Sequence, residues 1–167
     1  TVKVYENKFL PPDGLVDFLN EKVESSLYSV KTSNHIEDRG SMLNFSIVGR
    51  DCTLEQRQDY YEWDKENGER EKIVKEIQKN WNSVEASIGG QISIDIHEPG
   101  MDKSQVLYHI KQNYTGLIDK FVFIGDKTMK GGNDYPLVRV MKTVPNGFYY
   151  QTKGPEETQK ILESLVD

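Results

Sequence analysis

The spacing of apolar and polar residues along the chain predicts alternating helices and strands. Apolar residues recur with a helical period after P-P-D, residues 11–13, which predicts a helix that continues through Tyr28. The run M-L-N-F-S-I-V, residues 42–48, alternates enough to predict a strand, and a short extended run occupies residues 2–5. This part of the chain therefore mixes helical and extended segments.

A capping signal marks the next helix. Thr53 and Gln56 have the spacing of a capping box, in which each residue satisfies a backbone amide of the other. The aromatic residues that lie on roughly one side of this helix are Tyr60, Tyr61 and Trp63. Gly68 is expected to break or kink the helix before helical spacing resumes at Ile73 and continues to Trp81.

Residues 84–88 and 91–96 predict a pair of strands on either side of a Gly-Gly step. The run I-S-I-D-I alternates strictly, so Ser93 and Asp95 share one face while the isoleucines share the other. Two aligned polar residues can hold a ligand. The commoner alternative is that they form the wet side of an antiparallel sheet.

The pattern changes near residue 101, where we place a domain boundary. Asp102 can cap a helix that continues through Ile110. The segments that follow are a strand, two short apolar runs and a last helix: residues 121–124, 138–140 and 147–151, and the region from Pro155. We therefore expect an α/β protein, with an α+β piece that holds an antiparallel sheet followed by a short α/β piece.

Composition narrows the class of protein. The 167 residues are 36% hydrophobic, which is adequate for one ordinary domain or two small ones. The net charge of -6 is spread along the chain, which argues against a nucleic-acid partner. The single cysteine, Cys52, cannot form an internal disulfide, and no apolar run is long enough to span a bilayer or act as a signal peptide. These features predict a soluble, cytoplasmic protein without a membrane partner.

Two aspartates follow the apolar strand at residues 121–124. Asp126 comes directly after the strand, and Asp134 follows a loop in which Gly131 and Gly132 allow close approach of the backbone. Ligands of α/β domains bind at the ends of parallel strands, and Mg²⁺ prefers a few carboxylates together with water and a substrate phosphate. The loop therefore predicts a Mg²⁺ site, with a polar loop that merely caps a helix as an equal alternative.

Basic residues suggest a phosphate site. Arg50 ends a strand and Arg57 lies about one turn into the next helix, so both guanidinium groups can converge near the N-terminus of that helix. Two exposed surface arginines are the commoner arrangement. Lys103 lies at the start of a helix, where a cation is unfavourable unless an anion offsets it, although a surface lysine is the simpler reading.

Four segments, taken in order, resemble motifs of eukaryotic-type phosphomannomutases, a branch of the haloacid dehalogenase-like phosphotransferases. They are M-L-N-F-S-I-V-G-R-D-C-T-L-E-Q-R from Met42, I-G-G-Q-I-S-I-D-I from Ile88, G-M-D-K from Gly100 and I-G-D-K-T-M-K-G-G-N-D from Ile124. The resemblance runs from about Arg39 to the C-terminus. It implies that residues 1–8 are a remnant of the core, 9–101 the substrate-binding cap domain and 102–167 the C-terminal part of a Rossmann-like core.

The resemblance also implies roles for individual residues. Arg50, Arg57 and Ser93 would hold the distal phosphate of a hexose phosphate. The other substrate-binding residues would be Arg39 and Asp95, which contact sugar hydroxyls, with Asn44 and Gly90. Lys103 would neutralise the transferring phosphoryl group. Asp126 and Asp134 would be the metal residues: Asp126 would bind Mg²⁺, and Asp134 would support the acidic loop. Asp126 and Lys103 would be the catalytic residues.

The sequence departs from the family at the nucleophile. The superfamily carries it in D-x-D-x-[TV] on the first core strand, and no D-x-D occurs in these 167 residues. We expect the chain to be part of a longer enzyme and inactive alone. The alternative is a natural protein that lacks the nucleophile.

The function implied is interconversion of hexose 6-phosphate and hexose 1-phosphate, with mannose as the sugar, through a phosphoaspartyl enzyme and a bisphosphate intermediate. That reaction belongs to mannose metabolism and supplies GDP-mannose biosynthesis. A sugar phosphatase of the haloacid dehalogenase type and a non-catalytic module that binds sugar phosphate are the alternatives. A homodimer through the cap would be in keeping with the family, and the C-terminal piece is expected to expose unpaired sheet edges and to be poorly stable alone.

Overall fold

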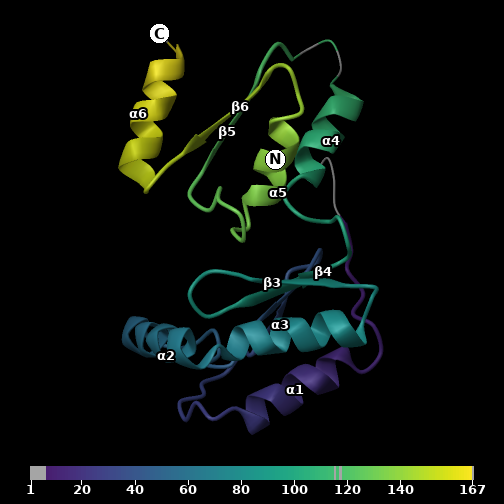
Figure 1. Cartoon of the computed structure of the whole chain (residues 1–167), viewed down its shortest axis with the longest axis vertical. Coiled ribbons are helices and arrows are strands. Elements are labelled where there is room, and N and C mark those ends of the chain that lie inside the picture. Colours follow the sequence, from purple (N-terminus) through teal and green to yellow (C-terminus); the bar gives the residue numbers. More distant parts are fainter. Residues whose placement is uncertain (1–6, 115, 117, 167) are drawn as a thin grey trace. The chain divides into compact units, whose positions relative to one another are not determined.

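The computed structural model describes residues 7–114, 116 and 118–166 (Figure 1). It divides into two compact units, one that ends at Pro99 and one that starts at Gly100. The strand predicted at residues 2–5 lies outside the described residues, as does most of the predicted core remnant, residues 1–8. Within the described part of the chain, no helix has both the length and the apolar character needed to cross a bilayer.

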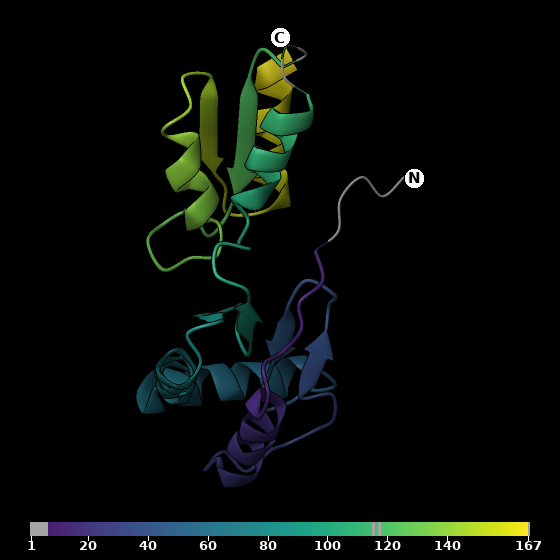
Figure 2. The same ribbon diagram turned by 90° about the vertical axis from the view of Figure 1, so that its right-hand side faces the viewer.

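The unit that ends at Pro99 packs helices on one face of an antiparallel sheet (Figure 2). Its elements are α1 (Leu15–Ser25), β1 (Ile36–Asp38), β2 (Leu43–Phe45), α2 (Leu54–Asn67), α3 (Glu69–Asn80), β3 (Glu85–Ile88) and β4 (Ile94–His97). The strand order is β1-β2-β4-β3, and every pair of neighbours is antiparallel. The expected α+β arrangement with an antiparallel sheet is confirmed.

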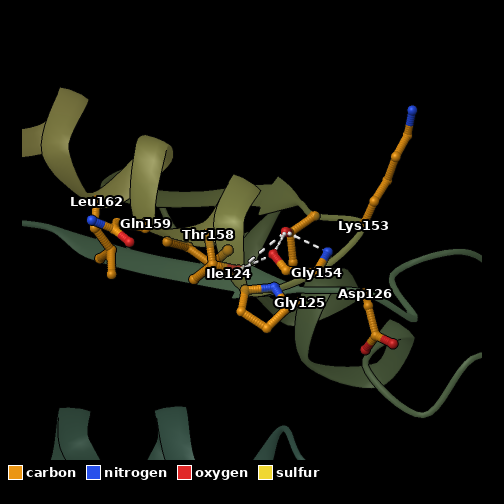
Figure 3. Close-up of a pocket in the computed structure, with 10 residues that line it drawn as sticks. Ile124, Gly125, Asp126, Lys153, Gly154, Thr158, Gln159 and Leu162 are labelled. Carbon is orange, nitrogen blue, oxygen red and sulfur yellow. Dashed lines mark hydrogen bonds between the residues drawn. The ribbon is translucent and has the colours of Figure 1, made fainter.

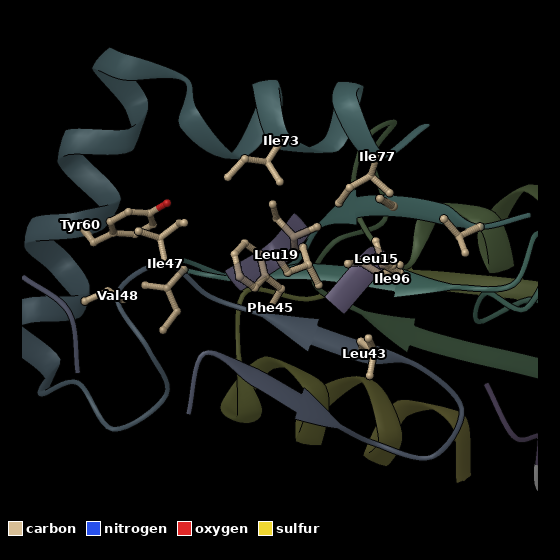
Figure 4. Close-up of a cluster of buried hydrophobic side chains, with 14 of the residues drawn as sticks. Leu15, Leu19, Leu43, Phe45, Ile47, Val48, Tyr60, Ile73, Ile77 and Ile96 are labelled. Atoms are coloured by element: carbon tan, nitrogen blue, oxygen red, sulfur yellow. The ribbon is translucent and has the colours of Figure 1, made fainter. Parts of the chain in front are cut away.

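One core lies between the sheet and the helices (Figure 4). Phe45 of β2 and Ile96 of β4 face this core, and Leu19 of α1 and Ile77 of α3 meet them, all of them fully buried. Since side chains alternate along a strand, the neighbouring positions on β2 and β4 belong to the opposite face of the sheet. The residues of β2 and β4 that do not face the core are therefore the ones that can contribute to a binding site.

Local signals explain where the helices of this unit begin and end. Gln56 N donates to Thr53 Oγ1 at 3.2 Å and Thr53 N donates to Gln56 Oε1 at 2.9 Å, which confirms the capping box. Gly68 has φ 62°, a left-handed conformation that suits glycine, and it separates α2 from α3 as predicted. Strand β1 was not predicted, because I-E-D is too short and too acidic to produce a strand pattern.

The unit from Gly100 places helices on both faces of a short parallel sheet (Figure 1). Its elements are α4 (Gln105–Asn113), β5 (Phe121–Gly125), α5 (Tyr135–Met141), β6 (Gly147–Gln151) and α6 (Pro155–Val166). Strands β5 and β6 pair in parallel, with Phe121 opposite Gly147. The apolar run at residues 138–140 lies in α5, where Leu137 and Met141 pack against Leu107 of α4.

The buried Tyr60 is expected to make the stability of the protein depend on pH in the alkaline range. Its ring is fully buried beside Tyr28 and Trp63, and its hydroxyl donates to Glu69 Oε2 at 3.2 Å. Burial raises the pKa of Tyr60 far above the ordinary value of about 10. The folded protein therefore keeps this proton when the unfolded chain loses it. We expect the free energy of unfolding to be unaffected by Tyr60 below about pH 10 and to fall as the pH rises further.

Urea unfolding at about pH 8 and about pH 11 measures this effect. Tyr60→Phe should lessen the loss of stability between the two conditions, and Tyr61→Phe, which alters a more exposed neighbour, should retain it. Tyr28, whose pKa burial also raises, leaves a residual dependence. An unchanged alkaline loss in Tyr60→Phe would show that another group is responsible.

Candidate functional site

A row of polar side chains crosses the face of the antiparallel sheet that lies opposite the core. The strand register places Glu37 of β1 beside Asn44 of β2, Asn44 beside Asp95 of β4, and Asp95 beside Ser87 of β3. Asn44 Nδ2 donates to Asp95 Oδ1 at 2.5 Å. The partly exposed Asp95 carboxylate can accept from sugar hydroxyls. Asn44 Oδ1 is buried and has no hydrogen-bond partner among the described residues, so Asn44 acts on this face through its bond to Asp95.

Two of the predicted arginines meet on the same surface. Arg50 Nη1 donates to Ser93 Oγ at 3.2 Å, although the two residues are 43 positions apart. Arg39 donates to Glu37 Oε2 through Nε at 2.9 Å and through Nη2 at 2.7 Å, and Arg50 Nε lies 3.6 Å from the same oxygen. The structure therefore brings Arg39 and Arg50 to Glu37, a residue that the sequence reading missed, and joins Arg50 to Ser93.

Arg57 has a buried guanidinium nitrogen, Nε, without an acceptor in the described part of the chain. The next residue, Gln58, accepts from Gln91 Nε2 at 3.2 Å, which brings the first turns of α2 against the loop between β3 and β4. A buried donor without a partner is unfavourable, and an anion bound at this place would satisfy it.

The loop between β3 and β4, residues 89–93, joins these groups. A Cβ at Gly89 would lie 2.7 Å from Asp95 Oδ2, so only glycine allows the Asp95 carboxylate to lie against the loop. Gly90 has open space around it, which leaves room for a ligand. Arg70 of α3 donates to carbonyls of this loop and is a second residue that the sequence reading missed. It sits in the run E-R-E-K, which has the composition of a solvated helix face.

A second group of predicted residues meets inside the unit from Gly100. Asp134 is buried and accepts from Lys103 Nζ and from Lys127 N, the latter at 2.9 Å. A Cβ at Gly125 would lie 2.5 Å from Asp134 Oδ2, and one at Gly132 would lie 2.1 Å from the Lys127 carbonyl. The glycines of this loop thus permit the turn that returns Asp134 to the end of β5.

An open pocket of about 520 Å³ lies next to this loop (Figure 3). Its lining comes from the end of β5, the segment after β6 and the start of α6. Thr152 and Thr158 hydrogen-bond to each other at 3.1 Å, and both hydroxyls also donate to the Gly154 carbonyl. The hydroxyls are therefore engaged within the protein, and Asp126 and Lys153 provide the charge.

Comparison with known proteins decides the family. The model of the family described as eukaryotic phosphomannomutase matches residues 12–167. The chain belongs to the eukaryotic phosphomannomutase family.

Individual phosphomannomutases give the same result. The phosphomannomutase of Drosophila melanogaster is 37% identical over 140 residues, which cover 83% of this chain and 53% of the relative. The probable phosphomannomutase of Caenorhabditis elegans is 32% identical over 154 residues, 91% of this chain and 58% of the relative. That of Saccharomyces cerevisiae is 36% identical over 134 residues, with 79% and 50% covered. The chain spans about half the length of the curated relatives it matches.

The metal assignment expected of a phosphomannomutase fits the two aspartates unequally. Asp126 is exposed at the end of β5, and no hydrogen bond or ion pair to its carboxylate occurs within the described residues. Asp134 already accepts from Lys103 and Lys127 N. Among the described residues, no three His, Cys, Asp or Glu side chains are grouped so that they could hold a metal ion. Of the two aspartates, only Asp126 therefore has a carboxylate that the described residues leave free to bind a cation such as Mg²⁺. The assignment of Asp134 as a metal ligand stays a prediction.

Two histidines and the cysteine lie in ordinary structural surroundings in the described part of the chain. His35 Nδ1 lies 3.0 Å from the Ser46 carbonyl, and His97 Nδ1 lies 2.9 Å from the Glu98 carbonyl. Cys52 is partly buried beside the hydrophobic core.

Proposed function

We propose that the chain provides the substrate-binding cap and the C-terminal part of the core of a phosphomannomutase, which interconverts hexose 6-phosphate and hexose 1-phosphate. Mannose phosphates are the proposed substrates, and the names of the relatives support this choice. The observation that carries the proposal is the meeting of Arg50 and Ser93 on the polar face of the sheet. Asp95 lies on the same face, and Arg57 Nε is buried without an acceptor among the described residues.

The proposed cap groups divide the work of binding. Arg50, Arg57 and Ser93 hold the distal phosphate, because guanidinium groups and hydroxyls donate strongly to phosphate oxygens. Asp95 accepts from sugar hydroxyls, and Asn44 supports the substrate site by orienting that carboxylate through its Nδ2. Arg39 and the backbone at Gly90 complete the surface. Glu37 offsets the charge of Arg39 and Arg50 before the phosphate arrives.

The proposed core groups act on the reacting phosphate. Lys103 neutralises the phosphoryl group in transfer, and Asp134 keeps its ammonium in place through their ion pair. Asp126 is the residue of this chain that would hold Mg²⁺. When bound, the cation would offset negative charge on the phosphoryl oxygens. The 167 residues contain no D-x-D nucleophile motif, so we expect the chain alone to bind hexose phosphate without turnover.

Two further expectations belong to this proposal. The protein would act in the cytoplasm, and it would form a homodimer through the cap. Both follow from the family rather than from contacts in the chain.

Calorimetric titration of the chain with mannose 1-phosphate, mannose and inorganic phosphate tests the proposal. Mannose 1-phosphate should bind, and mannose should bind at least about 100-fold more weakly because it makes none of the charge-assisted hydrogen bonds. Inorganic phosphate should fall between the two. Equal heats for mannose 1-phosphate and mannose would show that the arginine surface is not a phosphate site.

A further inference from the structure

Arg70 is a buried arginine at the start of α3, and its contacts converge on one loop. The residue is 5% exposed. Its Nη1 donates to the carbonyls of Gly89 and Gly90, both at 3.1 Å, and to that of Ser93 at 3.4 Å. One guanidinium nitrogen therefore ties α3 to both ends of the loop between β3 and β4.

Asp64 holds the arginine in this orientation. Its Oδ2 accepts from Arg70 Nε at 2.7 Å and its Oδ1 accepts from Arg70 N at 2.9 Å, so side chain and backbone are fixed together. Asp64 is 6% exposed. A buried ion pair is weak evidence for stability, because desolvation of both charges offsets their attraction. The ion pair between Asp64 and Arg70 therefore matters more for the geometry of the loop than for stability.

The orientation of the carbonyls determines where the loop amides point. In a trans peptide the carbonyl oxygen and the following N–H lie on opposite sides. Carbonyls of Gly89 and Gly90 that point to Arg70 therefore direct the amides of Gly90 and Gln91 away from it. Within the described residues neither amide has an acceptor. The same loop carries Ser93, whose hydroxyl accepts from Arg50.

We propose that Arg70, held by Asp64, is a positioning residue for hexose phosphate. It does not touch the ligand. It fixes the loop so that Ser93 Oγ stays on Arg50 and the amides of Gly90 and Gln91 remain available to phosphate oxygens. This inference rests on the proposed function, since it assigns Arg70 a part in that binding.

Arg70→Lys is the central variant. Lysine retains a cation beside Asp64, but its compact ammonium cannot reproduce the planar fork that reaches a carboxylate and the loop carbonyls together. We expect the affinity for mannose 1-phosphate to fall about tenfold, by analogy with the loss seen when residues that orient metal ligands are replaced. Lys75→Met, which removes an exposed cation of the same helix, should leave the affinity unchanged.

Ile77→Val separates positioning from stability. It trims a fully buried apolar side chain of α3 that cannot donate a hydrogen bond to a loop carbonyl, so it should lower stability and leave the affinity unchanged. In NMR spectra of the ligand-free protein, Arg70→Lys should shift the backbone amide resonances of Gly90 and Gln91, and Ile77→Val should leave them unchanged. Wild-type affinity together with unshifted amides in Arg70→Lys would overturn the proposal.

Two measurements guard against an unfolded variant. The double variant Asp64→Leu/Arg70→Met leaves no unpaired buried charge, and it should bind as weakly as Arg70→Lys. In the wild-type protein, the Gly89 amide, which donates to the Ser93 carbonyl at 2.9 Å, should exchange with solvent only on global unfolding; fast local exchange would overturn the proposal. If the wild-type chain bound no hexose phosphate, the proposed function would fail, and the amide shifts would still show whether Arg70 fixes the loop.

Discussion

Replacement of Arg50 and Arg57 by alanine in one protein is expected to abolish measurable binding of mannose 1-phosphate. Each guanidinium donates charge-assisted hydrogen bonds to phosphate, and a hydrogen bond to a charged group contributes about 1.5–3 kcal/mol. Loss of both arginines should therefore weaken binding by at least about 100-fold. Calorimetric titration measures the change directly.

The single variants separate the two arginines. Arg50→Ala also removes the contacts to Ser93 and Glu37, so the loop and β1 lose a partner. Arg57→Ala removes a buried donor that has no acceptor among the described residues, so it should weaken binding without lowering stability. Arg139→Ala, an exposed position on α5, is the control that removes an arginine elsewhere. Equal heats for the wild type and the double variant would mean that Arg50 and Arg57 are ordinary surface residues.

Local patterns were sufficient to predict most elements of the fold. The strict alternation of I-S-I-D-I predicted that the isoleucines are buried, although Ser93 on the other face is buried as well, and Thr53 and Gly68 marked the ends of α2. These signals act within a few residues of one another. Strand β1 depends instead on pairing with β2, because its own sequence has one apolar residue and two acids. Tertiary pairing overrides propensity in such a segment.

The candidate site was harder to assemble from sequence because its contacts join distant segments. Residue patterns alone named Arg50 and Ser93 separately, and the family resemblance grouped them; the structure adds the direct hydrogen bond between them. Glu37 and Arg70 were missed for the same reason, since each acts through partners on other elements. A charged residue in a polar run gives no local sign that it is buried.

The expectation of an exposed sheet in the C-terminal piece stays a prediction. Within the described residues, β5 and β6 have only each other as neighbours, and Val122 and Phe148 are exposed to 39% and 45%. Open strand edges beside apolar side chains favour association. This arrangement is the physical reason to measure the association of the chain before its binding.

Phe45→Ala is expected to lower the free energy of unfolding of the first unit by about 3–5 kcal/mol, the usual cost of deleting a buried phenylalanine side chain. Phe45 is fully buried between the sheet and the helices, so its loss leaves a cavity that the packed neighbours fill only in part. Urea unfolding followed by tryptophan fluorescence is a suitable measurement, because both tryptophans, Trp63 and Trp81, pack against this core.

Ser87→Ala is the matched control for Phe45→Ala. Ser87 lies on the polar face in the row that contains Asn44 and Asp95, and it is only partly buried, so its loss should change stability by less than about 0.5 kcal/mol. Comparable losses for the two variants would show that the sheet does not have one core face and one free face. The binding proposal depends on that division, because Asp95 is available to a ligand only if its neighbours on β4 take the core face.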